Sequence, residues 1–354
     1  MTGPSPDHDA DPNQANKALV WAYWRDLDGA AGAGPARLTE VATAAMAPDA
    51  PWHGHAPVGS LTGPVRFVES AWAPLVASFP DLRRETFLFF GGRSNGRVDG
   101  DASLDNRWWV TGTGVLRGTF AADYLTIPAT GTEVAIRWGE FCCIDEGRIV
   151  ETFFLIDVVD LMRQAGFEVL PPSRGIDGRY PRPAADDGIL LDPQDHDVSD
   201  HSLAHIRRFI FDGLNEYDQT DLASMGMADF FEPDVCWYGP GGIGACLGLD
   251  AFEDHHQRPW LVAFPDRRVQ DLDALIAEGS YSGAPGWAGV LATHTGLYLD
   301  VAATGRPIAF NGLDWWKRQG ERYIENWVFV DMVHLFDQFG VDLFERLRPS
   351  APSH

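Results

Sequence analysis

The sequence has very little lysine. Among its 354 residues, 51 are acidic and 27 are basic, and Lys17 and Lys317 are the only lysines. The resulting formal charge of −24 at pH 7 repels phosphate backbones and anionic lipid headgroups. The composition therefore argues against nucleic acid and against a membrane surface as partners.

Long apolar runs and cysteine motifs are also absent. No apolar segment is long enough to span a bilayer, and the start, MTGPSPDHDADPN, lacks the basic and apolar regions of a secretion signal. The four cysteines, of which Cys142 and Cys143 are adjacent, form no CxxC pair of the kind that holds zinc. We therefore expect a cytoplasmic protein with buried cysteines, no cofactor and no metal.

What the sequence does contain is an internal repeat. WHGHAPVGSLTG at 52–63 matches WYGPGGIGACLG at 237–248, and FPDLRR from Phe79 matches FPDRR from Phe264, at an offset of 185 positions. Further on, IVETFFLIDVVDLMRQAG from Ile149 matches YIENWVFVDMVHLFDQFG from Tyr323, at an offset of 174. The change of offset predicts an extra loop in the first copy, around GGRSNGRVDGDASLDNR at 91–107.

The repeat divides the chain into a first domain at 14–166, a linker at 167–200 that is rich in Pro, Gly and Asp, and a second domain at 201–348. Each copy begins with a helical pattern, has a further short helix at 64–79 or 250–264, and continues as strands rich in Trp, Val, Thr and Phe. Helices followed by long antiparallel strands predict an α+β fold.

The order of elements and the two endings, GRIVETFFLIDVVDLMRQAG and RYIENWVFVDMVHLFDQFG, resemble the SnoaL-like polyketide cyclases of the nuclear-transport-factor-2-like superfamily. The resemblance covers nearly all of both copies. It implies two tandem cones, each a curved antiparallel sheet wrapped by helices around a ligand pocket. Many members of the superfamily dimerise through their sheets, so the resemblance also implies a pseudo-dimer within one chain. Further assembly into a homo-oligomer is left open.

The superfamily includes isomerases, dehydratases, cyclases and binding proteins, so the resemblance does not name a reaction. We expect a lyase or isomerase that uses general acid–base chemistry, without an organic cofactor, on a small carbonyl-bearing or polyhydroxylated metabolite. The alternative is a non-catalytic small-molecule binder in which one copy serves as a scaffold.

Asp157 and Asp331 are the first pair of candidate catalytic residues, because each closes an apolar strand at the same place in its copy. Such a carboxylate is either a general base whose pKa is raised by an apolar cavity or the N-cap of the following helix. In the cyclases that the sequence resembles, the catalytic aspartate aligns three residues earlier, where this chain has Phe154 and Val328. Their mechanism therefore does not transfer residue for residue.

Glu140 and Asp314 form a second pair of candidates, at matched positions in RWGEF and GLDWW on the preceding strand. Arg137 lies three residues before Glu140. The interpretations are a catalytic acid, an acceptor for a substrate hydroxyl, or a structural pair of carboxylate and arginine.

Histidines distinguish the two copies. His53 and His55 lie two apart, so on a strand they point to the same side and are candidates for one pocket or one metal. The second copy has Tyr238 and Pro240 at these positions, and has its own set elsewhere, of which His294 replaces Thr113 or a neighbour. No spacing establishes a metal site, so hydrogen bonding to a polar ligand is favoured, with His55 and His294 as oxyanion partners.

Aromatic and polar side chains near these candidates are expected either to contact a ligand or to belong to the core. The predicted ligand-binding residues are Trp52, His53, Arg137, Trp138, Trp237, Tyr238, His255, His256, Trp260, Trp315 and Trp316.

Overall fold

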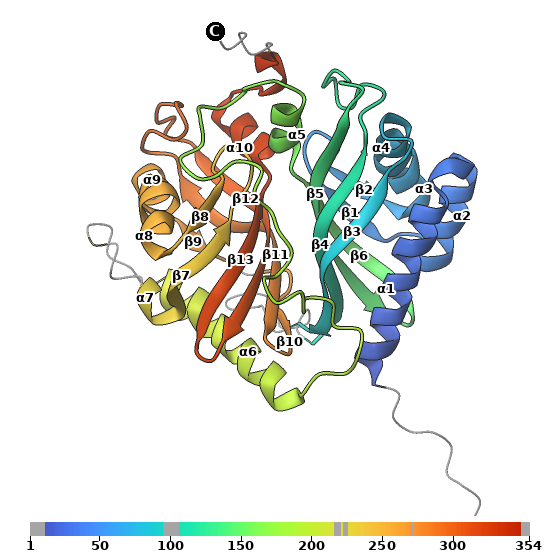
Figure 1. Cartoon of the computed structure of the whole chain (residues 1–354), viewed down its shortest axis with the longest axis horizontal. Helices are drawn as coiled ribbons and strands as arrows, with labels where there is room; N and C mark the ends of the chain where they lie inside the picture. The colour runs from blue at the N-terminus through green and yellow to red at the C-terminus, as the bar shows by residue number, and fades with distance from the viewer. Residues whose placement is uncertain (1–10, 95–105, 216–220, 222–225, 271, 348–354) are drawn as a thin grey trace, which may run out of the picture.

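The computed structural model describes residues 11–94, 106–215, 221, 226–270 and 272–347. Within them, each copy of the repeat forms one mixed sheet with helices against it (Figure 1). The predicted α+β class is confirmed, and the two sheets fit the tandem arrangement. The extra loop predicted around 91–107 lies largely outside the described residues.

The first copy begins with helices and ends with strands and a short helix. Its helices are α1 (Pro12–Gly29), α2 (Pro35–Ala45), α3 (Gly63–Phe67), α4 (Ala73–Ser78) and α5 (Val158–Gln164), and a π-helical turn, Val68–Trp72, joins α3 to α4. Its strands are β1 (Pro51–Gly54), β2 (Ser60–Thr62), β3 (Arg83–Arg93), β4 (Trp108–Thr119), β5 (Glu133–Asp145) and β6 (Arg148–Ile156). The order in the sheet is β2-β1-β6-β5-β4-β3, and among the described strands of this sheet only β1 and β6 pair in parallel.

The second copy repeats this plan. Its helices are α6 (His196–Arg208), α7 (Met227–Phe230), α8 (Leu249–Phe252), α9 (Arg258–Ala263) and α10 (Met332–Phe339), with π-helical turns at Phe209–Leu214 and Glu253–Gln257. Its strands are β7 (Phe231–Tyr238), β8 (Ala245–Leu247), β9 (Arg268–Val269), β10 (Ile276–Glu278), β11 (Tyr281–Thr293), β12 (Pro307–Gln319) and β13 (Arg322–Val330). The order is β10-β11-β12-β13-β7-β8, and β9 pairs with β11.

The linker ends earlier than predicted, because α6 begins at His196, inside the range 167–200. The side chain of Asp195 accepts hydrogen bonds from the backbone N–H groups of Asp197 and Val198, which makes it the N-cap of the helix. The surrounding sequence, DPQDHDVSD, has the composition of a loop and conceals this start. The outer limits of the two domains stay predictions.

The two sheets pack face to face at the centre, and most of the helices lie on the outer sides (Figure 1). Phe141 and Trp315, which occupy equivalent positions in the two copies, stack with ring centroids 5.3 Å apart. The indole N–H of Trp315 donates to Thr111 Oγ1 at 2.9 Å, and its ring lies against Gly139, where a side chain would collide. Since a residue contacts its own counterpart, the copies are related by a pseudo-twofold axis, as in a symmetric dimer.

Both lysines lie buried between the copies. The ammonium of Lys17, on α1, is 2.6 Å from Glu278 Oε1 on β10, and the carboxylate of Glu278 also accepts from the backbone N–H of Gly91. The ammonium of Lys317, on β12, is 2.7 Å from Asp187 Oδ1 in the linker. The two ion pairs therefore join the second copy to the first copy and to the linker.

Candidate active site

The second cone contains a cavity of about 180 Å³ between its sheet and its helices. Its walls are mainly apolar and aromatic, with a few polar side chains among them. The lining residues that matter below are Trp237, His256, Gln257, Trp260, Arg267, Val269, Asn311, Gly312, Asp314, Trp316, Asn326 and Val328. An apolar lining with a few polar groups is the usual lining of a site for a small organic molecule.

Asp314 is the carboxylate of this cavity. Gly312, Asp314 and Trp316 alternate along β12 and face the cavity, because successive side chains of a strand point to opposite faces. Val328 lies directly opposite Asp314 on β13. Val328 is the position at which the sequence comparison placed the catalytic aspartate of the resembled cyclases. The carboxylate of Asp314 therefore lies on the adjacent strand, next to that position.

The surroundings of Asp314 favour its neutral form. Burial raises the pKa of the carboxyl to about 8, and the hydrogen bond with the side chain of Asn326 opposes this shift. Asn326 is itself held in place, because its Nδ2 donates to the backbone carbonyl of Trp315 at 2.9 Å. The side chain of Asp314 remains partly exposed because it borders the cavity. It is thus a proton donor in reach of a ligand.

His256 and Gln257 reach the cavity from the π-helical turn Glu253–Gln257. The imidazole of His256 stacks on Trp237, with centroids 4.2 Å apart, and lies 5.4 Å from the ring of Trp260. Burial lowers the pKa of His256 to about 3, and the charge of Arg267 acts in the same direction. The imidazole is therefore neutral at physiological pH and available as a hydrogen-bonding group.

The interior of the first cone is occupied by side chains. The guanidinium of Arg84 lies 4.3 Å from the ring centroid of Trp138, 5.1 Å from that of Trp24 and 5.4 Å from that of Trp72. It is also 3.7 Å from Glu140 Oε2. Burial raises the pKa of Glu140 to about 7, against the effect of Arg84. Glu140 therefore belongs to a packed cluster and not to an open pocket.

The counterparts of these side chains explain why the second cone is hollow. In the first sheet Arg84 lies opposite Leu116, and in the second sheet Val269 lies opposite Val290, which is the counterpart of Leu116. The second copy therefore has a valine where the first has Arg84. Gly312 pairs with Val330 where Trp138 pairs with Ile156, so glycine replaces tryptophan.

The same replacement of a large ring occurs in the π-helical turns, where Gln257 stands at the position of Trp72. Together these exchanges empty the second cone, and in the part of the chain that the structure describes no arginine forms an ion pair with Asp314, although Arg267 also lines the cavity.

Asp157 and Asp331 lie outside the cavity and act as N-caps, the alternative that the sequence left open. Asp157 Oδ1 accepts from the N–H of Asp160, and Asp331 Oδ1 accepts from the N–H of His334. Their second oxygens accept across the copies, Asp157 from Gly241 and Asp331 from Ala56, each at 2.8 Å. Burial raises the pKa of both carboxyls. Their catalytic role stays a prediction that this geometry does not favour.

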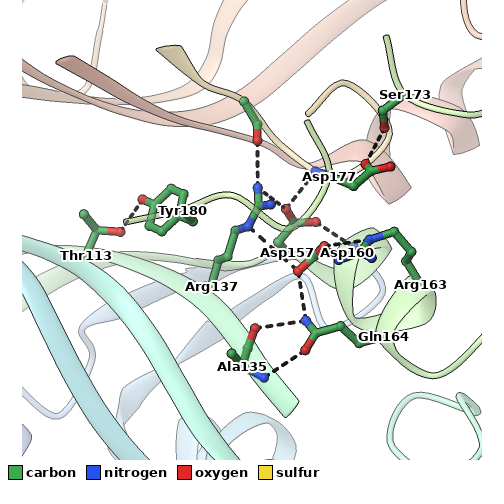
Figure 2. Close-up of polar contacts among 12 residues, drawn as sticks. Thr113, Ala135, Arg137, Asp157, Asp160, Arg163, Gln164, Ser173, Asp177 and Tyr180 are labelled. Atoms are coloured by element: carbon green, nitrogen blue, oxygen red, sulfur yellow. Dashed lines mark hydrogen bonds and ion pairs between the residues drawn. The ribbon is translucent and has the colours of Figure 1, made fainter. Parts of the chain in front are cut away.

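Arg137 does not pair with Glu140, contrary to one of the interpretations offered for this carboxylate. Because the two residues are an odd number of positions apart on β5, they face opposite sides of the sheet. Arg137 Nη1 lies 3.3 Å from Asp157 Oδ2 and donates to the carbonyl of Gly239 at 2.7 Å. Figure 2 shows these contacts, which lie at the interface between the two copies. The arginine that pairs with Glu140 is Arg84.

His53 and His55 do not face one pocket, contrary to their expected alternation, because β1 ends at Gly54 and the strand period stops before His55. His53 stacks on Phe153 and lies 3.5 Å from a carboxylate oxygen of Glu151. His55 is buried near Tyr124, and burial lowers its pKa to about 3.

His294 is packed into the core of the second copy. Its ring stacks on Phe339 with centroids 4.1 Å apart, and its Nδ1 lies 3.1 Å from Thr304 Oγ1. The counterpart of His294 in the first copy is Phe120 and not Thr113. The backbone N–H of His294 donates to the carbonyl of Arg306, and the backbone N–H of Phe120 makes the equivalent hydrogen bond to the carbonyl of Thr132. An aromatic contact explains the residue without a ligand.

The predicted ligand-binding residues separate into three groups. Trp237, His256, Trp260 and Trp316 line the cavity, and His255 lines a neighbouring one. Trp52 and Trp138 are buried in the first cone. The remaining four, Arg137, Tyr238, Trp315 and His53, lie at contacts between the copies.

Sequence reasoning missed Arg84, Asn326, Gln257 and Val269. A signal for two of them was present in the repeat, since aligning the copies at an offset of 185 sets Arg84 against Val269 and Trp72 against Gln257. Each exchange turns a space-filling side chain into a smaller one at the same position.

Among the described residues, no group of three or more His, Cys, Asp or Glu side chains is placed to hold a metal ion. None of the described helices combines the length and the apolar character that crossing a bilayer requires.

The known proteins named below are similar to about two fifths of this chain. No curated protein matches the chain. Among solved structures, AclR from Streptomyces galilaeus is 19% identical to this chain, and the match covers 40% of this chain and 86% of AclR, with a TM-score of 0.33. IdmH from Streptomyces antibioticus is 22% identical, and the match covers 41% of this chain and 97% of IdmH, with a TM-score of 0.29. A SnoaL-like polyketide cyclase from Agrobacterium tumefaciens is 19% identical, and the match covers 39% of this chain and 98% of the cyclase, with a TM-score of 0.30. In sequence, residues 205–339 match the family described as SnoaL-like polyketide cyclase.

Proposed function

We propose that the cavity of the second copy is the active site of an acid–base enzyme of the cyclase or isomerase type, and that Asp314 is its catalytic acid. The observation that carries the proposal is a carboxyl without an arginine partner at the wall of an apolar cavity. The match of residues 205–339 to a family of cyclases supports the same class of reaction. The first copy serves as a scaffold, since its interior is packed.

The chemistry that this geometry supports is proton transfer at a carbonyl group. The neutral carboxylic acid of Asp314 donates its proton to the carbonyl oxygen of the substrate as a bond forms or a double bond shifts. The carboxylate left behind accepts the proton that the substrate loses from its α-carbon, so no proton is gained or lost overall. A carboxyl with a pKa close to the working pH is suited to both steps.

Other residues orient the substrate and exclude water. Trp237, Trp260 and Trp316 provide flat apolar surfaces for an unsaturated or ring-containing substrate. His256, as a neutral imidazole, donates or accepts one hydrogen bond without adding charge. The cavity therefore favours a compact, mostly apolar substrate with one carbonyl group near Asp314.

The test is turnover in a metabolite extract of the host organism, with the mass of every component followed over time. A product of equal mass indicates isomerisation or cyclisation, and a loss of water indicates dehydration. We expect Asp314→Asn to lower the rate by about a hundredfold or more, since it keeps the shape and removes the transferable proton. Glu140→Gln, the matched change in the packed cone, is expected to leave the rate within about twofold.

Two outcomes contradict the proposal. The first is unchanged turnover in a folded Asp314→Asn variant. The second is a component that binds in stoichiometric amount and is never converted, which would identify the protein as a small-molecule binder.

A further inference from the structure

A second cavity lies next to the active-site cavity, and His256 lines both. The second cavity has a volume of about 150 Å³ and is called the outer chamber below. Its other walls come from the linker and from the second copy. They are Pro171, Pro172, Arg174, Gly242, Ile243, His255, Pro259 and the segment 297–300.

The linker wall of the outer chamber is fixed by backbone hydrogen bonds. Gly175 donates to the carbonyl of Ile243 at 3.0 Å, and Ile176 and Ala245 exchange a pair of hydrogen bonds at 2.8 and 2.9 Å. A side chain at position 175 would collide with the backbone of 243–245, so this close approach requires glycine. Arg174 is therefore held at the chamber by its immediate neighbours.

The charges of the outer chamber differ from those of the inner cavity. Arg174 is exposed, and among the described residues no hydrogen bond or ion pair occupies its guanidinium. His255 lies on the same wall, and Asp300 contributes one exposed carboxylate. In a chain with 51 acidic residues and 27 basic ones, an unpaired arginine beside a cavity is a specific donor for a carboxylate or a similar oxygen acceptor.

The volumes also favour joint use of the two cavities. Pockets for small organic ligands usually measure about 300–1,000 Å³. Neither cavity reaches that size alone, but the two together do. The imidazole of His256 separates them and is held by stacking on Trp237, without a hydrogen bond to another described side chain. Since the same side chain lines both cavities, its position is the one most able to join or separate them.

We infer that the outer chamber is a second part of the ligand site, in which Arg174 of the linker binds a carboxylate-bearing end of the molecule whose apolar part lies in the inner cavity. His256 acts as the gate between the two parts. This inference rests on the proposed function for the inner cavity. It gives the linker a role in specificity, because Arg174 comes from the linker and not from the second copy.

The test uses two fluorescent probes of similar shape and different charge. Anilinonaphthalene sulfonate carries an anionic group, and N-phenylnaphthylamine is neutral. We expect Arg174→Gln to weaken binding of the anionic probe by about fivefold to tenfold and to leave the neutral probe within about twofold. Asp300→Asn is expected to strengthen binding of the anionic probe, since it removes the opposing charge. Arg179→Gln, an exposed arginine of the same linker outside the chamber, is expected to change neither affinity.

The inner cavity is tested by Val269→Arg, which places an arginine where the first copy has Arg84. We expect this change to weaken both probes by at least about tenfold. Equal losses for both probes in Arg174→Gln, or none, would overturn the role of Arg174. Unchanged binding in Val269→Arg would overturn the joint site.

Failure of the inference is distinguishable from failure of the proposed function. Probe binding needs no turnover, so the affinities of the two probes report on the joint site whether or not a substrate is converted. If turnover is found while Arg174→Gln has no selective effect, only the inference falls.

Discussion

Glu140 and Asp314 show how neighbours decide the role of a carboxylate. The two occupy equivalent positions on β5 and β12, opposite Phe154 and Val328. Glu140 faces the guanidinium of Arg84 at 3.7 Å, whereas Asp314 faces a cavity and Asn326. One replacement, of Arg84 by Val269, removes the counter-charge and part of the volume that filled the cone. A structural carboxylate and a candidate catalytic acid thus differ mainly in what lies beside them.

The raised pKa of Asp314 predicts a dependence of stability on pH. The folded protein holds a proton up to a pKa of about 8, whereas an unfolded aspartate loses it near pH 4. The wild-type protein therefore loses stability as the pH rises through this window, and Asp314→Asn does not share that loss. Relative to wild type, we expect the variant to gain about 2–4 kcal/mol in free energy of unfolding between about pH 4 and pH 9.

Urea unfolding of both proteins across this range measures the difference. A constant difference in the free energy of unfolding at all pH values would show that Asp314 titrates normally. The same assignment predicts that kcat/KM falls as the pH rises through about 8, because the neutral acid is the active form.

The exchange of Arg84 and Val269 is itself testable in reverse. Arg84→Val removes the cation that lies among Trp24, Trp72 and Trp138, so we expect a loss of about 2–4 kcal/mol in free energy of unfolding. The double variant with Glu140→Gln is expected to recover part of this loss, because Glu140 is then no longer a buried carboxylate without its arginine, although Asp28 still loses its contact with Arg84. Urea unfolding of the single and double variants tests this, and additive losses would contradict the pairing of Arg84 with Glu140.

At the scale of elements, the helix caps of the two copies also connect them. Asp157 caps α5 and accepts from Gly241 of the second copy, and Asp331 caps α10 and accepts from Ala56 of the first. The contacts are reciprocal, because Ala56 and Gly241 hold equivalent positions in the loops after β1 and β7. One carboxylate therefore fixes both the start of a helix and the position of the other copy.

This double role predicts the cost of removing the carboxylate. Asp331→Ala loses the cap and leaves the partly buried N–H of Ala56 without its acceptor, so we expect a loss of about 2–4 kcal/mol in free energy of unfolding. Asp195→Ala removes the cap of α6, which has no such contact, and is expected to cost only about 1 kcal/mol. Equal losses of unfolding free energy in the two variants would contradict the contribution of the contact between copies.

At the scale of the whole molecule, the two copies have divided the tasks that a symmetric dimer duplicates. The first copy contributes a packed cone and one face of the interface, and the second copy contributes the cavity. Sheet-to-sheet packing within one chain occupies the surface that a dimer would use. Assembly of the tandem chain into a larger oligomer stays a prediction, as does its cytoplasmic location.

The two buried lysines offer a measurement of this interface. Since Lys17 and Lys317 are ion-paired and buried, we expect an amine-acylating reagent to modify them at least about a hundredfold more slowly in the folded protein than in urea. Trp315→Ala removes the ring that stacks on Phe141 and is expected to speed modification of both lysines. Mass spectrometry of the peptides that contain them measures the rates. Rapid modification of folded wild-type protein would contradict the closed interface.

Sequence alone predicted the repeat and the α+β class, because these follow from repeated patterns of apolar residues and turns. The pairing of the two copies through their sheets was implied only by the resemblance to the SnoaL-like cyclases. Sequence alone also selected Asp314, Trp237, His256, Trp260 and Trp316 as candidate site residues. The sequence did not show that Glu140 and Trp315 lie outside the cavity. Glu140 is the carboxylate that corresponds to Asp314 in the first copy, and Trp315 is the neighbour of Trp316. The residues that line the cavity and those in the packed core both have aromatic neighbours in the sequence, so local sequence does not distinguish a cavity wall from a packed core.

The sequence by itself thus determined which residues alternate along the strands and that the chain contains the same plan twice. Tertiary structure alone decided which cone is hollow, because that depends on side chains brought together from separate elements. Arg84 of β3, Trp138 of β5 and Trp24 of α1 fill one cone, and Val269 of β9 and Gly312 of β12 leave the other open. A cavity is the volume that several distant residues fail to fill, and no single segment of sequence specifies it.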